Sequence, residues 1–155
     1  MKTLVVYYSR TGNTGEIAEE IAGALGCNIE EIMGTEDRSG PLGYMRSVYH
    51  AIMKKPTVLN EIKNDPSDFD LVVIGTPVWN MKMSTPIRTY ITQNQAKFNN
   101  VAFFGTASGN AFDGTFRGMK ELIGVTPTST MGVRAKEIKN NSYSSKLNEF
   151  IKEIQ

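Results

Sequence analysis

Short apolar runs alternate with amphipathic stretches along this 155-residue chain, and this alternation limits its fold more than any other feature. Within residues 71–74 and 101–104 every position is apolar. A strand of this kind is covered on both faces, which is typical of a parallel sheet with helices on each side. The sequence predicts five such strands, at residues 2–8, 28–33, 69–75, 101–105 and about 127–133.

Apolar residues at helical spacing follow each predicted strand. Asn13 and Glu16 have the spacing of a capping box at the start of the first helix. Thr85 is expected to cap a later helix with Pro86 at its first position, and Asp113 to cap the next one. The apolar stripes comprise Ile17, Ala18, Ile21, Ala22 and Leu25; Leu42, Met45, Tyr49 and Ile52; Ile87, Tyr90 and Ile91; Phe116, Met119, Leu122 and Ile123; and Leu147, Phe150, Ile151 and Ile154.

Strand and helix therefore alternate five times, which predicts one α/β domain over residues 1–155. Right-handed crossovers place helices on both faces of the sheet, giving a three-layer α/β/α sandwich. The expected architecture is a doubly wound, five-stranded parallel sheet of order 2-1-3-4-5. In this order the first, third and fourth strands are neighbours, and ligands bind beyond their carboxyl ends.

Composition narrows the class of protein. The net charge is only +1, so no nucleic-acid partner is expected. No apolar run approaches the ~20 residues needed to cross a membrane, and the N-terminal run is too short for a secretory signal. The one cysteine, Cys27, cannot form an internal disulfide, which fits a cytoplasmic location. His50 has no second His or Cys as a partner, so neither a metal site nor a catalytic triad is predicted.

The first loop at the predicted sheet edge contains hydroxyl side chains and a glycine directly before a helix. Backbone N–H groups and the positive end of the helix dipole meet at such a place, which suits a phosphate. The loop lacks the Gly-Lys-Ser/Thr ending of a Walker A motif and the glycine spacing of a dinucleotide site. A single phosphate monoester is therefore the expected ligand, and an ordinary helix-capping loop is the alternative. The residues of this first loop are Ser9, Arg10, Thr11, Gly12, Asn13 and Thr14.

The second loop carries the only tryptophan of the chain, Trp79. An indole between a buried strand and a helix needs a partner, so it is a platform for an aromatic ring, a cap on the core or a protein contact. The third loop follows the fourth strand. The candidate binding residues are Thr76, Pro77, Val78, Trp79, Asn80 and Met81 in the second loop, and Thr106, Ala107, Ser108, Gly109 and Phe112 in the third.

In their order and spacing, the three loops resemble the flavodoxin family over essentially the whole chain, in its short-chain form. The likeness rests on the first loop, on Thr76-Pro77-Val78-Trp79 and on Phe104-Gly105-Thr106. It implies bound FMN, with the phosphate in the first loop, the isoalloxazine ring stacked on Trp79, and the pyrimidine end at residues 106–109. Ser108 and Phe112 stand where many members of the family have an acidic residue and a tyrosine.

The resemblance implies an electron-transfer protein that carries electrons between a reductase and redox partner proteins. Such a carrier is expected to be a monomer with its FMN near the surface. Two alternatives stay open. One is an FMN-dependent oxidoreductase that reduces quinones or nitro compounds with NAD(P)H. The near-neutral charge and the altered third loop favour this alternative. The other is a flavodoxin-like domain that has lost its flavin and only mediates protein contacts.

Overall fold

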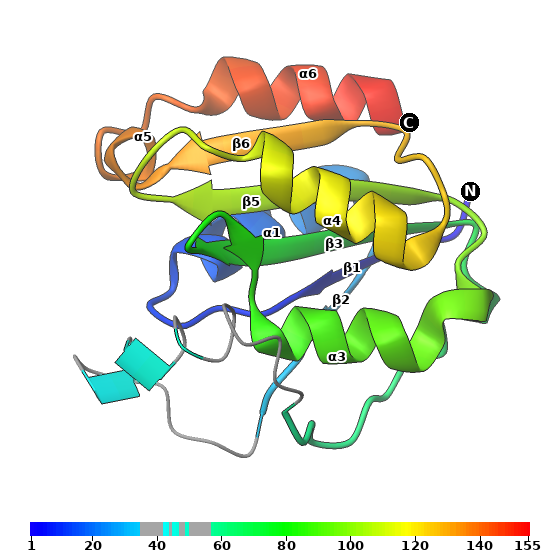
Figure 1. Cartoon of the computed structure of the whole chain (residues 1–155). Coiled ribbons are helices and arrows are strands. Elements are labelled where there is room, and N and C mark those ends of the chain that lie inside the picture. Colours follow the sequence, from blue (N-terminus) through cyan, green and yellow to red (C-terminus); the bar gives the residue numbers. More distant parts are fainter. Residues whose placement is uncertain (35–41, 44, 47–48, 50–56) are drawn as a thin grey trace.

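A parallel sheet with helices on both faces forms the centre of the molecule (Figure 1). The computed structural model describes residues 1–34, 42–43, 45–46, 49 and 57–155. The main strands run in the order β2-β1-β3-β5-β6, which confirms the predicted order 2-1-3-4-5. These strands are β1 (Thr3–Tyr7), β2 (Asn28–Glu31), β3 (Leu71–Trp79), β5 (Val101–Ala107) and β6 (Thr130–Arg134).

Helices cover both faces of the sheet. In Figure 1, α3 (Thr85–Asn94) and α4 (Asp113–Ile123) lie in front of the strands, whereas α1 (Asn13–Leu25) lies behind them. The last helix, α6 (Ser144–Ile154), packs on the same core as α1. Successive strand residues point to opposite faces, so Val6 enters the core under α3 and α4 while Val5 enters the core under α1 and α6.

Several short elements were not predicted. The most important is β4 (Lys82–Met83), which pairs antiparallel with the end of β3 and makes a hairpin at the carboxyl edge of the sheet. The others are α5 (Ala135–Lys139) and the 3₁₀ turns η1 (Pro66–Asp68) and η2 (Gln95–Lys97). Elements of two to five residues carry too little periodic pattern to be recognised in a sequence.

The expected helix starts are wrong in detail. The N-cap of α1 is Gly12, at φ 99°, which has no side chain, so the capping box of Asn13 and Glu16 does not form. The cap of α3 is Ser84, which puts Thr85 at its first position and Pro86 at its second. Each boundary has moved by one residue, because the backbone conformation at the flanking position decides where the helix begins.

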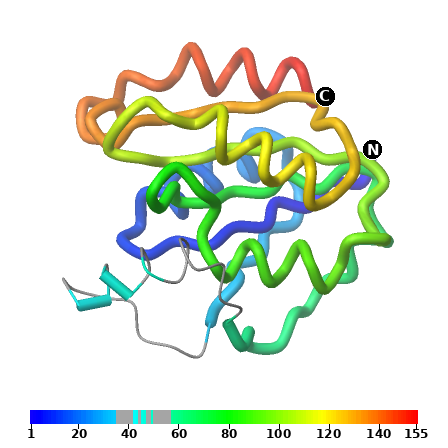
Figure 2. Tube along the Cα trace, viewed as in Figure 1, coloured from blue at the N-terminus to red at the C-terminus, as the bar shows by residue number. Residues whose placement is uncertain are grey.

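The carboxyl ends of the strands meet at the left of the view, and both chain termini lie at the opposite edge (Figure 2). Ile52 and His50, which the sequence placed on the second helix, lie outside the described residues. Among the residues that are described, no helix has the length and apolar character that crossing a bilayer requires.

Candidate functional site

The sheet order brings the three predicted loops to one edge. β1, β3 and β5 are parallel neighbours, so the segments after Tyr7, Trp79 and Ala107 emerge close together (Figure 1). A direct contact joins the first loop to the strand that leads into the third. The hydroxyls of Thr14 and Thr106 are hydrogen-bonded at 2.7 Å, and both side chains are buried. Residues far apart in the sequence thus form one continuous rim.

The first loop folds around the Ser9 side chain. The backbone N–H groups of Gly12 and Gly15 both donate to Ser9 Oγ, each at 3.1 Å. Thr11 and Gly12 are exposed, whereas Arg10 and Asn13 are partly exposed. The N-cap residue Gly12 has no side chain and Ser9 takes only the Gly15 amide of α1, so the amides of Asn13 and Thr14 remain for an external acceptor. The loop therefore fits a phosphate bound by backbone amides and the helix dipole.

Carboxylates surround the cavity next to this loop. Its volume is about 450 Å³, and its lining includes Tyr7, Glu16, Glu19 and Glu31. Burial, with the charge of Glu19, raises the pKa of Glu31 above its ordinary value. Burial and the nearby charges of Glu31 and Glu19 raise the pKa of the Tyr7 hydroxyl. The environment on this side of α1 is thus unfavourable for further negative charge, and the amides must do most of the phosphate binding.

The second predicted loop is a tight hairpin. Val78 pairs with Met83 and Trp79 with Lys82, so Asn80 and Met81 alone make the turn. Their φ angles are 49° and 60°, which is the pattern of a type I′ turn. Asparagine tolerates this conformation, whereas methionine adopts it at a cost of about 1 kcal/mol or more. The Met81 side chain itself is 61% exposed, so it is available for contact at the rim.

Thr76 and Trp79 are packed in the protein interior in this structure. Thr76 is fully buried, and its Oγ1 accepts a hydrogen bond from the backbone N–H of Ser84 at 2.9 Å. Trp79 is only 3% exposed, and its ring lies edge-on against Tyr8 with centroids 5.6 Å apart. The indole therefore packs as a cap on the core, and the open platform expected for a flavin is not present. Stacking on Trp79 stays a prediction that requires the ring to be uncovered.

The third loop divides into an exposed part and an anchor. Residues 108–111 are exposed, whereas Phe112 is 6% exposed and stacks on Phe116 at a centroid distance of 6.1 Å. A Cβ on Gly132 would lie 2.3 Å from the Phe112 ring, so this glycine makes room for it. The ring is turned into the core in this structure, and a contact between Phe112 and the cofactor stays a prediction. Contacts from Ser108 and Gly109 remain compatible with their exposure.

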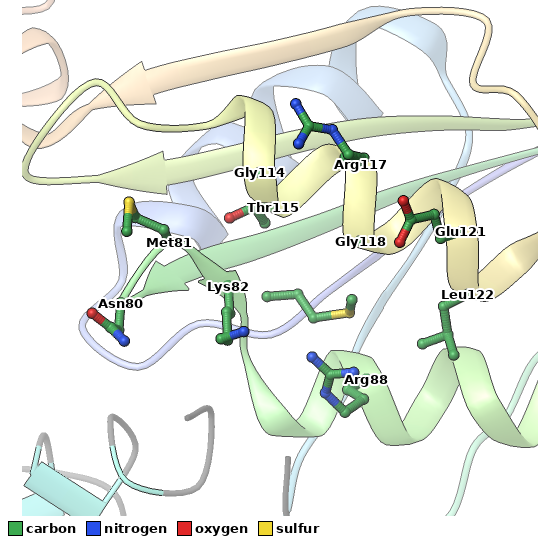
Figure 3. A pocket seen from close by; sticks show the side chains of 11 residues that line it. Asn80, Met81, Lys82, Arg88, Gly114, Thr115, Arg117, Gly118, Glu121 and Leu122 are labelled. Atoms are coloured by element: carbon green, nitrogen blue, oxygen red, sulfur yellow. The ribbon is translucent and has the colours of Figure 1, made fainter. Parts of the chain in front are cut away.

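Sequence reasoning missed a groove beside the hairpin. It lies between the hairpin, α3 and α4, and has a volume of about 650 Å³ (Figure 3). Lys82, Arg88, Arg117 and Glu121 contribute its charges. The signal was present in part, because Lys82 and Arg117 are cations close in sequence to two of the loops. Within the described part of the chain, no cluster of His, Cys, Asp or Glu could hold a metal ion.

A comparison with protein families explains this arrangement of loops. A family model described as Flavodoxin matches residues 2–154, nearly the entire length. The chain belongs to the flavodoxin family. No curated protein matches it significantly.

Solved structures agree with the family. A flavoprotein from Lactobacillus acidophilus NCFM, crystallised in complex with FMN, is 26% identical with a TM-score of 0.75, covering 90% of this chain and 97% of that one. A point mutant of flavodoxin from Pseudomonas aeruginosa is 15% identical with a TM-score of 0.57, covering 99% and 98%. An NADH:FMN oxidoreductase in its apo form is 13% identical with a TM-score of 0.60, covering 98% and 87%. The last two similarities concern the fold alone.

Proposed function

We propose that this flavodoxin is an FMN-binding electron carrier that passes electrons between a reductase and acceptor proteins. The observation that carries the proposal is the bond between Thr14 and Thr106, because it joins the loop suited to a phosphate to the third loop in one rim. FMN as the cofactor is supported by membership of the family and by the FMN complex of the Lactobacillus protein. The single cysteine supports a reducing, cytoplasmic setting.

The first loop would bind the phosphate end of FMN. Ser9 holds the loop closed through Gly12 and Gly15, so the loop loses little conformational freedom when a ligand arrives. Thr11 offers an exposed hydroxyl, and the backbone amides of Asn13 and Thr14 lie at the start of α1. These neutral donors suit a phosphate because they need no cation, which matches the carboxylates of the adjoining cavity.

The hairpin turn and the third loop would flank the other end of the cofactor. FMN, when bound, supplies the isoalloxazine ring that takes up and releases electrons. Asn80 and Met81 are exposed on one side of the edge, and Ser108 and Gly109 on the other. Met81 would give the ring a soft apolar neighbour, while backbone groups at 108–109 would bind its polar end. An exposed rim of this kind favours transfer to another protein, for which a monomer suffices.

A second candidate function is an FMN-dependent NAD(P)H oxidoreductase acting on quinones or nitro compounds. The groove with Lys82, Arg88 and Arg117 favours it, because cations beside the flavin edge would attract an anionic dinucleotide. The likeness to an NADH:FMN oxidoreductase concerns only the fold. The carrier remains the better-supported proposal, since two of the three cations lie on helices and away from the loops that would bind the flavin.

The test is a redox assay of purified, FMN-loaded protein. For a carrier, the yellow flavin absorbance persists with NADPH alone and bleaches when a flavoprotein reductase is added in catalytic amount. Fast NADPH oxidation by the protein itself, accelerated by a quinone, would replace the carrier with the oxidoreductase. A colourless protein that takes up no FMN would contradict both and would leave the contact-mediating domain.

A further inference from the structure

The groove beside the hairpin is a built cavity on the α3 and α4 face of the sheet. Arg88 comes from α3 and points into it, and Lys82 enters from β4 (Figure 3). Glu121 and Arg117 come from α4 on the opposite wall. The α4 wall is shallow because it contains Gly114 and Gly118, and a Cβ at Gly118 would already touch Met83 at 3.7 Å.

The charges of this cationic groove are unbalanced. Three cations and one carboxylate line the groove, although the Arg117 side chain points away from Lys82 and Arg88 (Figure 3). In the described part of the chain none of the three cations takes part in an ion pair. Arg88 Nε is buried and has no hydrogen-bond partner, and the same is true of Thr115 Oγ1 on the α4 wall. Burial lowers the pKa of Arg88, which means that its surroundings disfavour the charge. A buried N–H without a partner is costly, and an anion in the groove that accepted a hydrogen bond from Arg88 Nε would offset that cost.

We propose that the cationic groove binds the phosphate group of a small phosphorylated molecule, with Arg88 as the main anchor. Guanidinium groups donate paired hydrogen bonds to phosphate, and Lys82 adds a second positive charge from the neighbouring wall. The volume of about 650 Å³ is that of a small-molecule site. An acidic protein would instead require exposed cations on a flat surface, and Arg88 is half-buried between two helices.

This site is distinct from the first loop and does not depend on flavin binding. The first loop lies at the start of α1, on the other face of the sheet from α3 and α4. The two sites share only the hairpin, because Asn80 and Met81 line the groove and also form the turn expected beside the flavin. An occupant of the groove would therefore lie next to the redox edge without occupying it.

The experiment is an NMR titration of ¹⁵N-labelled, FMN-loaded protein with pyrophosphate. We expect saturable shifts of the Lys82, Gly114 and Gly118 amides, while the amides of Gly12 and Asn13 stay in place. Arg88→Gln should weaken binding by about tenfold or more, the equivalent of one lost charged hydrogen bond. Glu121→Gln should strengthen binding severalfold, because it removes the carboxylate that lines the groove. Lys152→Gln, an exposed lysine on α6, is the control and should change nothing.

Four results would overturn the proposal. They are shifts that do not saturate, equal affinity in Arg88→Gln, release of FMN by pyrophosphate, and tighter binding of a hexaglutamate peptide through the same amides. Release of FMN with shifts at the groove amides alone would mean that the groove holds the flavin phosphate. Release with shifts at Gly12 and Asn13 would mean that pyrophosphate binds the first loop. Preference for the peptide would mean protein docking. Flavin content is measured first by absorbance. If the protein takes up no FMN, the same titration on the purified protein still tests the groove separately from the proposed function.

Discussion

Two parts of the same sheet edge are suited to anions by opposite means. The first loop, residues 9–14, offers backbone amides at the start of α1, and its adjoining cavity contains Glu16, Glu19 and Glu31. The cationic groove beyond the hairpin contains Lys82, Arg88 and Arg117. The first loop is also closed by hydrogen bonds that the amides of Gly12 and Gly15 donate to Ser9 Oγ, whereas the hairpin turn is strained at Met81.

This contrast shows that positive charge and backbone geometry point to different places for the phosphate of FMN. A search for Lys and Arg leads to the cationic groove, whereas the loop geometry and helix dipole lead to the first loop. Amides give a fixed geometry that is insensitive to salt, whereas cations give attraction that salt screens. The predictions below test whether the first loop depends on its internal geometry and the hairpin on its strain.

The largest effect is expected from Thr14→Val, which removes one hydroxyl of the buried pair. Thr106 Oγ1 then loses its partner in a residue that is only 5% exposed, and we expect a loss of about 1–3 kcal/mol in the free energy of unfolding. FMN affinity should fall as well, because the first loop is no longer tied to β5. Urea unfolding and flavin fluorescence titration measure the two quantities.

The double variant Thr14→Val/Thr106→Val is the matched control. With both hydroxyls gone, neither partner is left alone in the interior, and part of the lost stability should return. The single variant Thr106→Val completes the comparison. If the losses in unfolding free energy of Thr14→Val and Thr106→Val simply add in the double variant, the hydrogen bond at the rim does not hold the loops together.

Gly12→Ala should have the second-largest effect on stability and FMN binding. Gly12 has φ 99°, where a Cβ is strained although no atom lies within 4 Å of it. We expect a loss of about 1–2 kcal/mol in unfolding free energy, with weaker FMN binding, because the loop must change its backbone path. Gly23→Ala, in the exposed last turn of α1, is the control and should stabilise the protein by up to about 0.5–1 kcal/mol. Equal effects at the two glycines would refute a special role for the loop geometry.

Met81→Gly tests the strained side of the comparison. Its φ of 60° suits glycine, so this change should raise the free energy of unfolding by up to about 1 kcal/mol although it deletes a side chain. Met33→Gly removes an equally long, exposed side chain from a position without positive φ and should lower stability. Thermal unfolding measures the stability of both variants against the parent. A loss of stability in Met81→Gly would show that the turn is not strained.

The smallest effect is expected from Glu31→Gln, beside the first loop. The pKa of Glu31 is raised above its ordinary value of 4.5, so its ionised form is disfavoured in the folded state. The variant should therefore have a slightly higher melting temperature than the parent at pH 7. The difference should shrink as the pH falls and vanish below about 4.5, where the carboxyl is protonated in both states. Glu149→Gln on α6 serves as the control, and an unchanged difference at pH 4 would contradict the expectation.

The sheet could be predicted because its strands are apolar at consecutive positions. Residues 71–74 and 101–104 form the first parts of β3 and β5, and the predicted order followed from the α/β repeat. The hairpin could not be predicted in the same way. β4 contains only Lys82 and Met83, and its register depends on a turn made by Asn80 and Met81, which lacks the usual glycine.

The position of the candidate site could be predicted from the sequence, whereas the orientation of several of its side chains could not. The carboxyl ends of neighbouring strands fix where the loops lie, whatever residues they contain. Whether Trp79 and Phe112 face a ligand or the core depends on distant partners, here Tyr8 and Gly132. Arg88 was overlooked for a similar reason, because only the packing of α3 beside α4 brings it into a cavity.

The Thr14–Thr106 bond has a consequence for how the protein is made. Its two residues are 92 positions apart, so the rim is incomplete until β5 has emerged from the ribosome and joined the sheet. A nascent chain that ends before this point contains the whole first loop but lacks the strand that holds it. We therefore expect cofactor capture only after β5 has joined the sheet, and a product truncated before β5 should remain colourless.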